Sequence, residues 1–198
     1  MVLDNNILRE LDKKVILIQS DSCSLDLSKL VRNSLEQDAL VHSDLLENGS
    51  TRIGKREKRK CEHETRVGLL DAWDYATKKF DGNITQQLIF DVAKRINCGK
   101  DIFYRSESVR ITGEDAVLPP RAEKVPIQMD ALLRTVNNKD YHPVERAALT
   151  HLHFARIHPL IDGNGRSSRL LQNLILNNEE YAPATIDVGE RTFYQQLL

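Results

Sequence analysis

The sequence predicts an all-α protein, mainly a helical bundle, with one short β-hairpin. Over most of the 198 residues, apolar side chains recur at spacings of three and four, which is the period of a helix with one buried face. Residues 102–120 break this period with short β-prone runs around a turn signal. By its length the chain is one domain, large enough to bury a core without disulfides.

The first part of the chain, 1–60, is predicted to be an N-terminal helical region that packs with the rest as one unit. Apolar residues recur at helical spacing over 7–18 and again over 25–41. A polar stretch follows and contains the basic run 55–60, which we expect to be a solvated loop or the start of a helix. The core domain is expected to occupy 61–198.

Within the core domain, helices are expected on both sides of the β-prone segment. Turn and cap signals bound most of them: Asn97-Cys98-Gly99 stops one helix, and Pro143 suits the first turn of another. Pro159 prevents that second helix from simply continuing, so His158 is expected at a helix end. The expected helices fall near 67–80, 88–96, 127–136, 143–157 and 166–176.

Composition excludes several classes of protein. A formal net charge of -1 argues against a surface built for nucleic acid or a membrane. The chain has no apolar run near the ~18 residues of a membrane span, and charged residues among the first 20 exclude a signal-peptide core there. Three widely spaced cysteines favour free thiols in a reducing compartment. We therefore expect a cytoplasmic protein.

Twelve consecutive residues carry most of the chemistry. They are His-Pro-Leu-Ile-Asp-Gly-Asn-Gly-Arg-Ser-Ser-Arg, and an apolar helical run follows directly. Gly163 and Gly165 lack a Cβ and flank Asn164, so an anion can approach the backbone closely at the N-terminus of the following helix. Arg166 and Arg169 stand three residues apart and can face one side of that helix.

A titratable base and a carboxylate lie just before or next to this anion-binding turn, the cradle formed by residues 163–166. His158, with an unperturbed pKa near 6.5, can take a proton from a hydroxyl at neutral pH. Asp162 offers the hard oxygen ligands that Mg²⁺ combines with substrate phosphates. Each feature alone is common in structural roles, since a Gly-Asn-Gly sequence is usually a turn. Their fixed order predicts a site that holds a nucleotide triphosphate on Mg²⁺ and moves part of it to a hydroxyl.

The same twelve residues closely resemble the signature of the Fic domain family, HPFx(D/E)GNGRxxR. One position differs, where Leu160 replaces the usual Phe and keeps an apolar anchor of another shape. The resemblance implies the Fic fold, ATP as substrate, Mg²⁺ as cofactor, and AMP transfer to a Ser, Thr or Tyr hydroxyl of a protein. It implies the following roles: His158 as base, Asp162 as metal ligand, Gly163, Asn164 and Gly165 as anion hole, Arg166 and Arg169 on the phosphates with Arg169 at the γ-phosphate, and Tyr194 as an adenine contact.

The resemblance also implies where a target protein docks. Fic domains carry a β-hairpin flap beside the active-site loop, and residues 102–120 occupy the matching interval. The family clamps an extended target segment along the flap by main-chain hydrogen bonds. Expected partners are therefore ATP and a target docked along 102–120, with a homo-oligomer left open and no membrane or nucleic acid.

A second motif lies upstream. Ser43-Asp44-Leu45-Leu46-Glu47-Asn48 matches the family's inhibitory pattern (S/T)xxxE(G/N), whose glutamate reaches the second arginine of the signature. The resemblance therefore implies that Glu47 pairs with Arg169 and occupies the fork meant for the γ-phosphate. Without the signature, the same string would be a helix C-terminus stopped at Asn48-Gly49.

Alternative functions remain on the same residues. A hydrolase that removes AMP, with Glu47 positioning a water, would use the same site, as would a transferase with another nucleotide donor. Gly165 argues against the kinase-like variant, which carries Lys there. A non-enzymatic binding module using the basic run is the third alternative. His151 and His153 are two apart on a helix, so we assign them to packing rather than metal binding, and Trp73 to the core.

Overall fold

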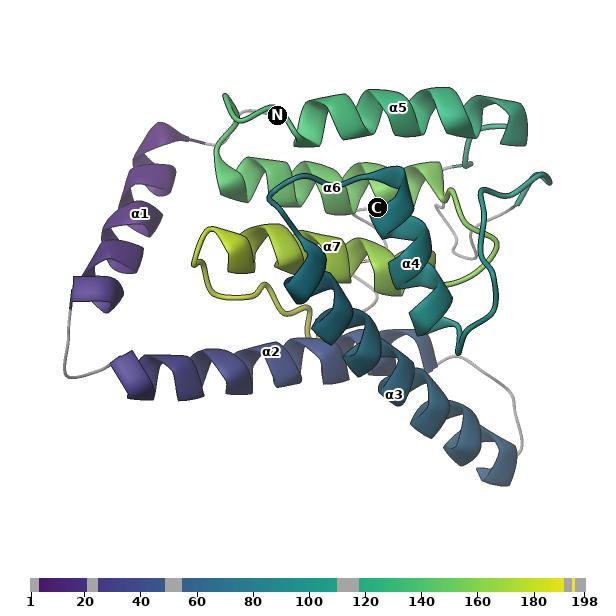
Figure 1. The fold of residues 1–198 in the computed structure, drawn as a ribbon, viewed down its shortest axis with the longest axis horizontal. Coiled ribbons are helices and arrows are strands. Elements are labelled where there is room, and N and C mark those ends of the chain that lie inside the picture. Colours follow the sequence, from purple (N-terminus) through teal and green to yellow (C-terminus); the bar gives the residue numbers. More distant parts are fainter. Residues whose placement is uncertain (1–3, 21–24, 49–54, 110–117, 191–193, 195–198) are drawn as a thin grey trace.

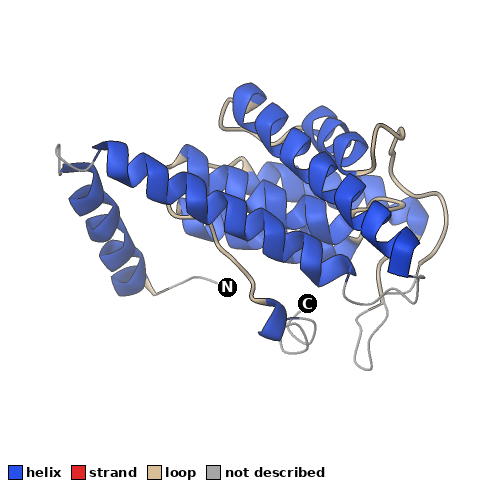
Figure 2. Cartoon of the chain, turned by 90° about the horizontal axis from the view of Figure 1, so that it is seen from below, coloured by secondary structure: helices blue, strands red, loops and turns tan. Residues whose placement is uncertain are grey.

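The computed structural model describes residues 4–20, 25–48, 55–109, 118–190 and 194, and over these residues the chain is all-helical (Figures 1 and 2). This confirms the predicted all-α class. The described α-helices are α1 (Asn5–Ser20), α2 (Leu25–Asn48), α3 (Lys55–Lys79), α4 (Gln86–Ile96), α5 (Val125–Val136), α6 (Pro143–Ile157) and α7 (Asn164–Asn178), with short 3₁₀ turns at Ala122–Lys124 and Val188–Glu190.

The helices α6 and α7 form the central pair of the bundle. α5 packs on α6, α3 packs on α4 and on α7, and α2 crosses below α7 and α3, while α1 stands at the edge (Figure 1). The core lies between these helices and includes fully buried side chains such as Phe154, Leu171, Leu174, Met129 and Leu69. Their burial on the inner helix faces is the dominant stabilising term.

Local signals fix the ends of the helices that carry the site. Thr85 caps α4 by accepting a hydrogen bond from the Leu88 amide at 3.1 Å. At the start of α6, His142 Nδ1 accepts from the Val144 amide at 3.2 Å, while Glu145 accepts from the His142 amide at 3.3 Å. Pro143, at the first position of α6, has no amide hydrogen to lose there. The expected start of α6 is thus confirmed.

Three expectations concern segments near the limits of the described chain. The basic run 55–60 belongs to the first turns of α3, whose side chains there lie outside the described residues. The helix α3 continues across residue 60. The division into 1–60 and 61–198 stays a prediction. The hairpin over 102–120 also stays a prediction, because residues 110–117 lie outside the described part. In the described arms, the pairing is a single antiparallel bridge from Tyr104 to Leu160.

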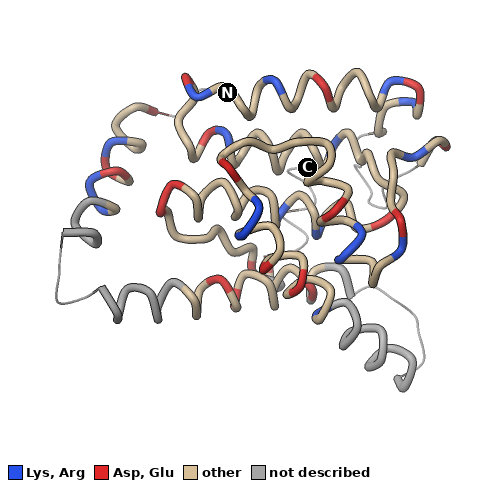
Figure 3. Tube along the Cα trace, viewed as in Figure 1, with Lys and Arg blue, Asp and Glu red and all other residues tan. Residues whose placement is uncertain are grey.

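Charge and hydropathy are ordinary across the described residues. Lysines and arginines are interspersed with aspartates and glutamates along the helices (Figure 3). In the part of the chain that the structure describes, none of the helices combines the length and the apolar character needed to cross a membrane.

Candidate active site

The turn between α6 and α7 presents His158 at the end of a helix, as the sequence predicts. His158 is the C-cap of α6 with φ 49° and ψ 57°, and its amide donates to the Phe154 carbonyl at 3.0 Å. A left-handed conformation is uncommon for a residue other than glycine and costs energy. The backbone there reverses before Pro159, and the half-buried imidazole lies beside the loop that leads to α7.

Asn164 holds this loop together with its side chain. Its Oδ1 accepts from the Leu160 amide and its Nδ2 donates to the Leu160 carbonyl, both at 2.8 Å. The side chain is buried, and both hydrogen bonds are internal to the loop. The sequence assigns Asn164 to the anion hole; with its side chain engaged, the backbone amide is the group that it can offer to a phosphate.

Gly163, the residue just before α7, has a conformation that needs glycine. Its φ is 79°, and a Cβ there would approach Asn97 Nδ2 to 2.9 Å. Asn97 ends α4 and lies against the loop: Nδ2 donates to the Ala93 carbonyl at 2.8 Å and to the Asp162 carbonyl at 3.5 Å. The sequence indicates only a helix stop at Asn97, because nothing local links residue 97 to residue 162.

Asp162 and Arg166 form an ion pair at the mouth of the cradle. Arg166 Nη2 lies 3.3 Å from Asp162 Oδ1, which also accepts from the Gly163 amide at 2.6 Å. The Arg166 side chain is 11% exposed, whereas that of Asp162 is 67% exposed. Arg166 Nη2 also reaches Asn97 Oδ1 at 3.5 Å. The arginine is therefore anchored by the loop before α7 and by the end of α4, while the carboxylate faces solvent.

The exposed carboxylate fits a magnesium ion held mainly by a bound nucleotide. Both contacts of Asp162 given above use Oδ1, so its second oxygen is available to a cation. Among the described residues, no cluster of three or more His, Cys, Asp or Glu forms a closed metal site. Mg²⁺ usually takes one or two carboxylates and completes its shell with phosphates and water, so one carboxylate such as Asp162 would suffice as the protein ligand.

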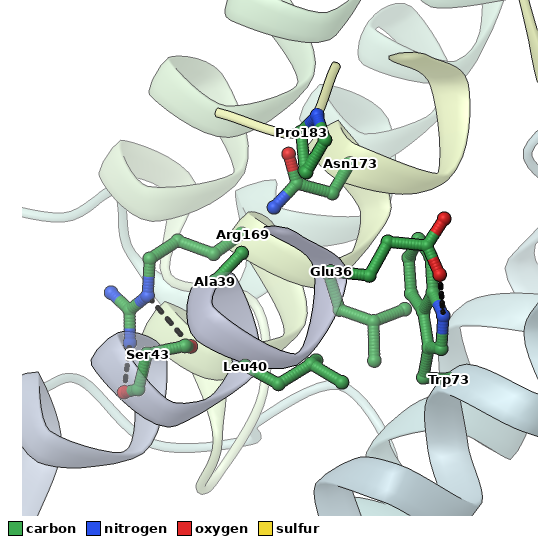
Figure 4. A pocket seen from close by; sticks show the side chains of 9 residues that line it. Glu36, Ala39, Leu40, Ser43, Trp73, Arg169, Asn173 and Pro183 are labelled. Carbon is green, nitrogen blue, oxygen red and sulfur yellow. Dashed lines mark hydrogen bonds between the residues drawn. The ribbon is translucent and has the colours of Figure 1, made fainter. Parts of the chain in front are cut away.

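Arg169, the second arginine, is buried and held by a side chain from α2. Its Nε donates to Ser43 Oγ at 2.9 Å, and its Nη2 donates to the Ser43 carbonyl at 3.1 Å (Figure 4). The structure thus joins the signature to the upstream motif, through its serine. Glu47 lies in the last turn of α2, and its side chain is outside the described residues. The expected contact between Glu47 and Arg169 stays a prediction.

Tyr194 also meets Arg169. The Tyr194 hydroxyl accepts from Arg169 Nη1 at 3.3 Å and lies 3.0 Å from His151 Nε2. Burial, with the nearby Arg169 charge adding to it, lowers the pKa of His151 to about 4, so the imidazole is neutral at pH 7. Its Nε2 can then accept a hydrogen bond from the Tyr194 hydroxyl. The sequence assigned His151 to packing and missed this contact; the adenine role of Tyr194 stays a prediction.

A pocket opens beside Arg169, between α2, α3 and α7 (Figure 4). It measures about 300 Å³ with its open mouth included, and Ser43, Arg169, Asn173 and Pro183 contribute to its wall. Trp73 closes one side, and its Nε1 donates to Glu36 at 3.2 Å. The indole is buried, which confirms its expected place in the core.

The arrangement of the helices resembles that of solved Fic proteins. A Fic family protein from Desulfovibrio desulfuricans G20 has a TM-score of 0.80 and 23% identity, covering 99% of this chain and 66% of that one. The chain therefore has the Fic fold. Residues 82–176 match the model of the Fic/DOC family, and the chain belongs to that family.

Curated relatives share this assignment. Protein adenylyltransferase Fic of Nematostella vectensis is 28% identical over 221 residues, which cover 99% of this chain and 50% of the relative. Protein adenylyltransferase Fic of Drosophila melanogaster is 30% identical over 161 residues, 75% of this chain and 31% of the relative. The chain thus spans half or less of the length of these relatives.

Proposed function

We propose that this chain transfers AMP from ATP to a hydroxyl group of a protein, and that α2 restrains the reaction. The observation that carries the proposal is the convergence of His158, Asp162 and the N-terminus of α7 on one turn, with Arg169 behind it. The names of the curated relatives support the same activity.

In the proposed reaction, the oxygen of a target Ser, Thr or Tyr attacks the α-phosphorus of ATP. His158 accepts the hydroxyl proton, a new P–O bond forms, and the bond to the β-phosphate breaks with pyrophosphate leaving. The amides at the start of α7 and the Arg166 guanidinium stabilise negative charge on the phosphates. Asp162 would hold Mg²⁺, which when bound supplies further charge neutralisation. Positioning and electrostatics would account for most of the acceleration.

The target is proposed to lie along residues 102–120. The bridge from Tyr104 to Leu160 brings the start of this segment next to the loop between α6 and α7. An extended peptide added there would bring a hydroxyl close to His158, because the loop that carries His158 is the neighbour of Tyr104 in the bridge.

The restraint is proposed to act through Arg169. Ser43 occupies the Nε and Nη2 side of the guanidinium, so that side cannot also bind a γ-phosphate in bidentate fashion. ATP would then bind weakly or in a pose unsuited to in-line attack. We propose that Glu47, one helical turn after Ser43, adds to this restraint.

The same conformation favours a second candidate, removal of AMP from a modified protein. AMP has no γ-phosphate, so a site with Arg169 engaged by Ser43 loses nothing in binding it. In this reaction, a water would attack the phosphorus and the protein hydroxyl would leave with a proton.

The experiment uses ATP radiolabelled at the α-phosphate, with Mg²⁺, the full chain and a cell lysate as target. Glu47→Gly is expected to incorporate label, and adding His158→Ala should reduce incorporation on the order of 10²–10⁴-fold. His153→Ala is the matched control, because His153 lies on the same helix with an exposed side chain. Incorporation that survives His158→Ala would disprove the base assignment. Release of label from a target protein that already carries labelled AMP, with no incorporation from ATP, would favour the second candidate.

A further inference from the structure

Arg105 is a buried cation whose hydrogen bonds go to backbone carbonyls around the catalytic turn. The residue is 3% exposed. Its Nε donates to the His158 carbonyl at 2.8 Å, and Nη2 donates to the Ile157 carbonyl at 3.3 Å. The Arg105 amide donates to the Pro159 carbonyl at 2.9 Å. One residue thus contacts three consecutive carbonyls at the end of α6.

These carbonyls need such a partner. The last carbonyls of a helix lack amide donors from a following turn, and Pro159 cannot supply an amide hydrogen. The C-terminal end of a helix also carries partial negative charge, which a cation stabilises. Arg105 satisfies both requirements, and in doing so it fixes the backbone on either side of His158.

The same guanidinium also joins the two ends of the segment expected to bind the target. Nη1 donates to the Glu107 carbonyl at 2.8 Å, and Nη2 donates to the Pro120 carbonyl at 2.6 Å. Residues 107 and 120 flank the turn of the expected flap. A planar guanidinium with five donors can serve all these acceptors at once, whereas an ammonium group cannot match the geometry.

We infer that Arg105 is a positioning residue, which clamps both ends of the flap segment to the backbone of His158 and so sets the distance between the target hydroxyl and the base. This inference rests on the proposed function. Arg105 contacts neither the signature arginines nor the start of α7 in the hydrogen bonds described above. Its loss should therefore lower turnover while ATP affinity stays the same.

The test compares Arg105→Lys with Arg146→Lys, both in the Glu47→Gly chain. Arg146 is a matched control because it is also 3% exposed, yet it pairs with Glu179 at 2.8 Å, away from the catalytic turn. Three quantities are measured: AMP incorporation at saturating ATP, ATP affinity by calorimetry, and amide hydrogen exchange over 103–108 and 157–163. Thermal unfolding reports the stability of each variant.

For Arg105→Lys we expect turnover to fall on the order of 10²-fold, as for a small misplacement of reacting groups, with faster exchange in both segments and unchanged ATP affinity. Arg146→Lys should leave turnover and amide exchange in both segments unchanged, even if the variant unfolds at a lower temperature. Equal turnover in the two variants would overturn the inference. If Arg105→Lys does not fold, Arg105→Gln replaces it, and failure of both to fold overturns a positioning role in favour of a purely structural one.

The outcome remains distinguishable from a failure of the proposed function. A parent chain that neither transfers nor removes AMP would disprove the proposed function by itself. Amide hydrogen exchange would then test only whether Arg105 holds the backbone around His158. Faster exchange confined to Arg105→Lys would support this role, and equal exchange in the two variants would overturn it.

Discussion

Asparagine side chains substitute for backbone at three places in the described chain. Asn164 exchanges two hydrogen bonds with the backbone of Leu160, and Asn137 does the same with Ile84 at 2.8 Å each way. Asn173 pairs likewise with Ala184. An amide side chain has an acceptor oxygen and a donor NH₂ group, so it can form the two hydrogen bonds that a residue of a paired strand would form. In Asn164 this fixes the loop between His158 and α7.

At Gly163, a single methyl group would test how tightly that loop is built. Gly163→Ala meets two penalties: a left-handed φ of 79°, and a contact of 2.9 Å with Asn97 Nδ2. Gly99 is the matched control, since its φ is 85° and nothing lies within 4 Å of an added Cβ. We expect Gly99→Ala to lower the free energy of unfolding by about 1 kcal/mol and Gly163→Ala to lower it by more. Urea unfolding measures both; equal losses would show that the approach to Asn97 carries no cost.

At the residue scale, the sequence predicted the parts of the site that are close together along the chain. His158, Asp162 and Arg166 can be found because one turn carries them all. Arg105, Asn97 and His151 were missed as site residues, because their contacts join positions 43 to 65 residues apart. An isolated arginine in a β-prone run gives no local sign that it donates to a helix end.

At the element scale, periodicity identified the helices but not what each one covers. The buried positions Ala39, Leu40, Ser43 and Leu46 of α2 follow helical spacing, so the helix itself was predictable. Its position against α7 depends on tertiary packing and is suggested only by the upstream motif. The run 102–105 was expected to form one arm of a hairpin, and the hairpin stays a prediction. The described bridge from Tyr104 to Leu160 pairs this run with the loop between α6 and α7.

The contact of α2 with α7 leads to a prediction about Ser43. Ser43→Ala removes the hydroxyl that accepts from Arg169 Nε and leaves the carbonyl contact, so we expect ATP affinity and AMP incorporation to rise, by less than in Glu47→Gly. Ser34→Ala, on an exposed position of the same helix, should change neither. A hydrogen bond to a charged group contributes about 1.5–3 kcal/mol. Without the bond from Arg169 Nε to Ser43, less free energy would hold the arginine away from a phosphate. Calorimetry with ATP measures the first quantity; an unchanged affinity would mean that Ser43 Oγ does not restrain the arginine.

At the scale of the whole molecule, α1 is attached to the bundle through a small polar cluster. Asp12 accepts from the Tyr181 hydroxyl and lies 3.0 Å from His142 Nε2. Since His142 Nδ1 accepts from the Val144 amide, its Nε2 carries the hydrogen and donates to Asp12. The hydrogen bond from Tyr181 lowers the pKa of Asp12, against the opposing effect of burial, and His142 lowers it further. The N-terminal helix is thereby joined to the start of α6 and the end of α7.

This cluster predicts a pH-dependent contribution to the stability of the chain. A carboxylate whose pKa is lowered by folding stabilises the folded state above its unfolded pKa of 3.8, and the contribution disappears as the pH falls through the lower, folded value. Asp12→Asn should therefore lower the free energy of unfolding at pH 7 by about 1 kcal/mol, because the side chain is 44% exposed and solvent weakens the interaction. The difference from the unmodified chain should shrink towards zero below pH 3.8.

The control for Asp12 is another acidic residue of α1. Glu10 pairs with Lys13 at 2.7 Å, but both side chains are more than 60% exposed, so Glu10→Gln should cost no more than about 0.5 kcal/mol. Urea unfolding at pH 7 and below pH 3.8 measures both variants, and amide exchange within α1 shows whether the helix detaches before the bundle unfolds. Equal losses for Asp12→Asn and Glu10→Gln at pH 7 would contradict the attachment. A selective loss with faster exchange in α1 alone would mean that the cluster holds this helix while the catalytic bundle is stable without it.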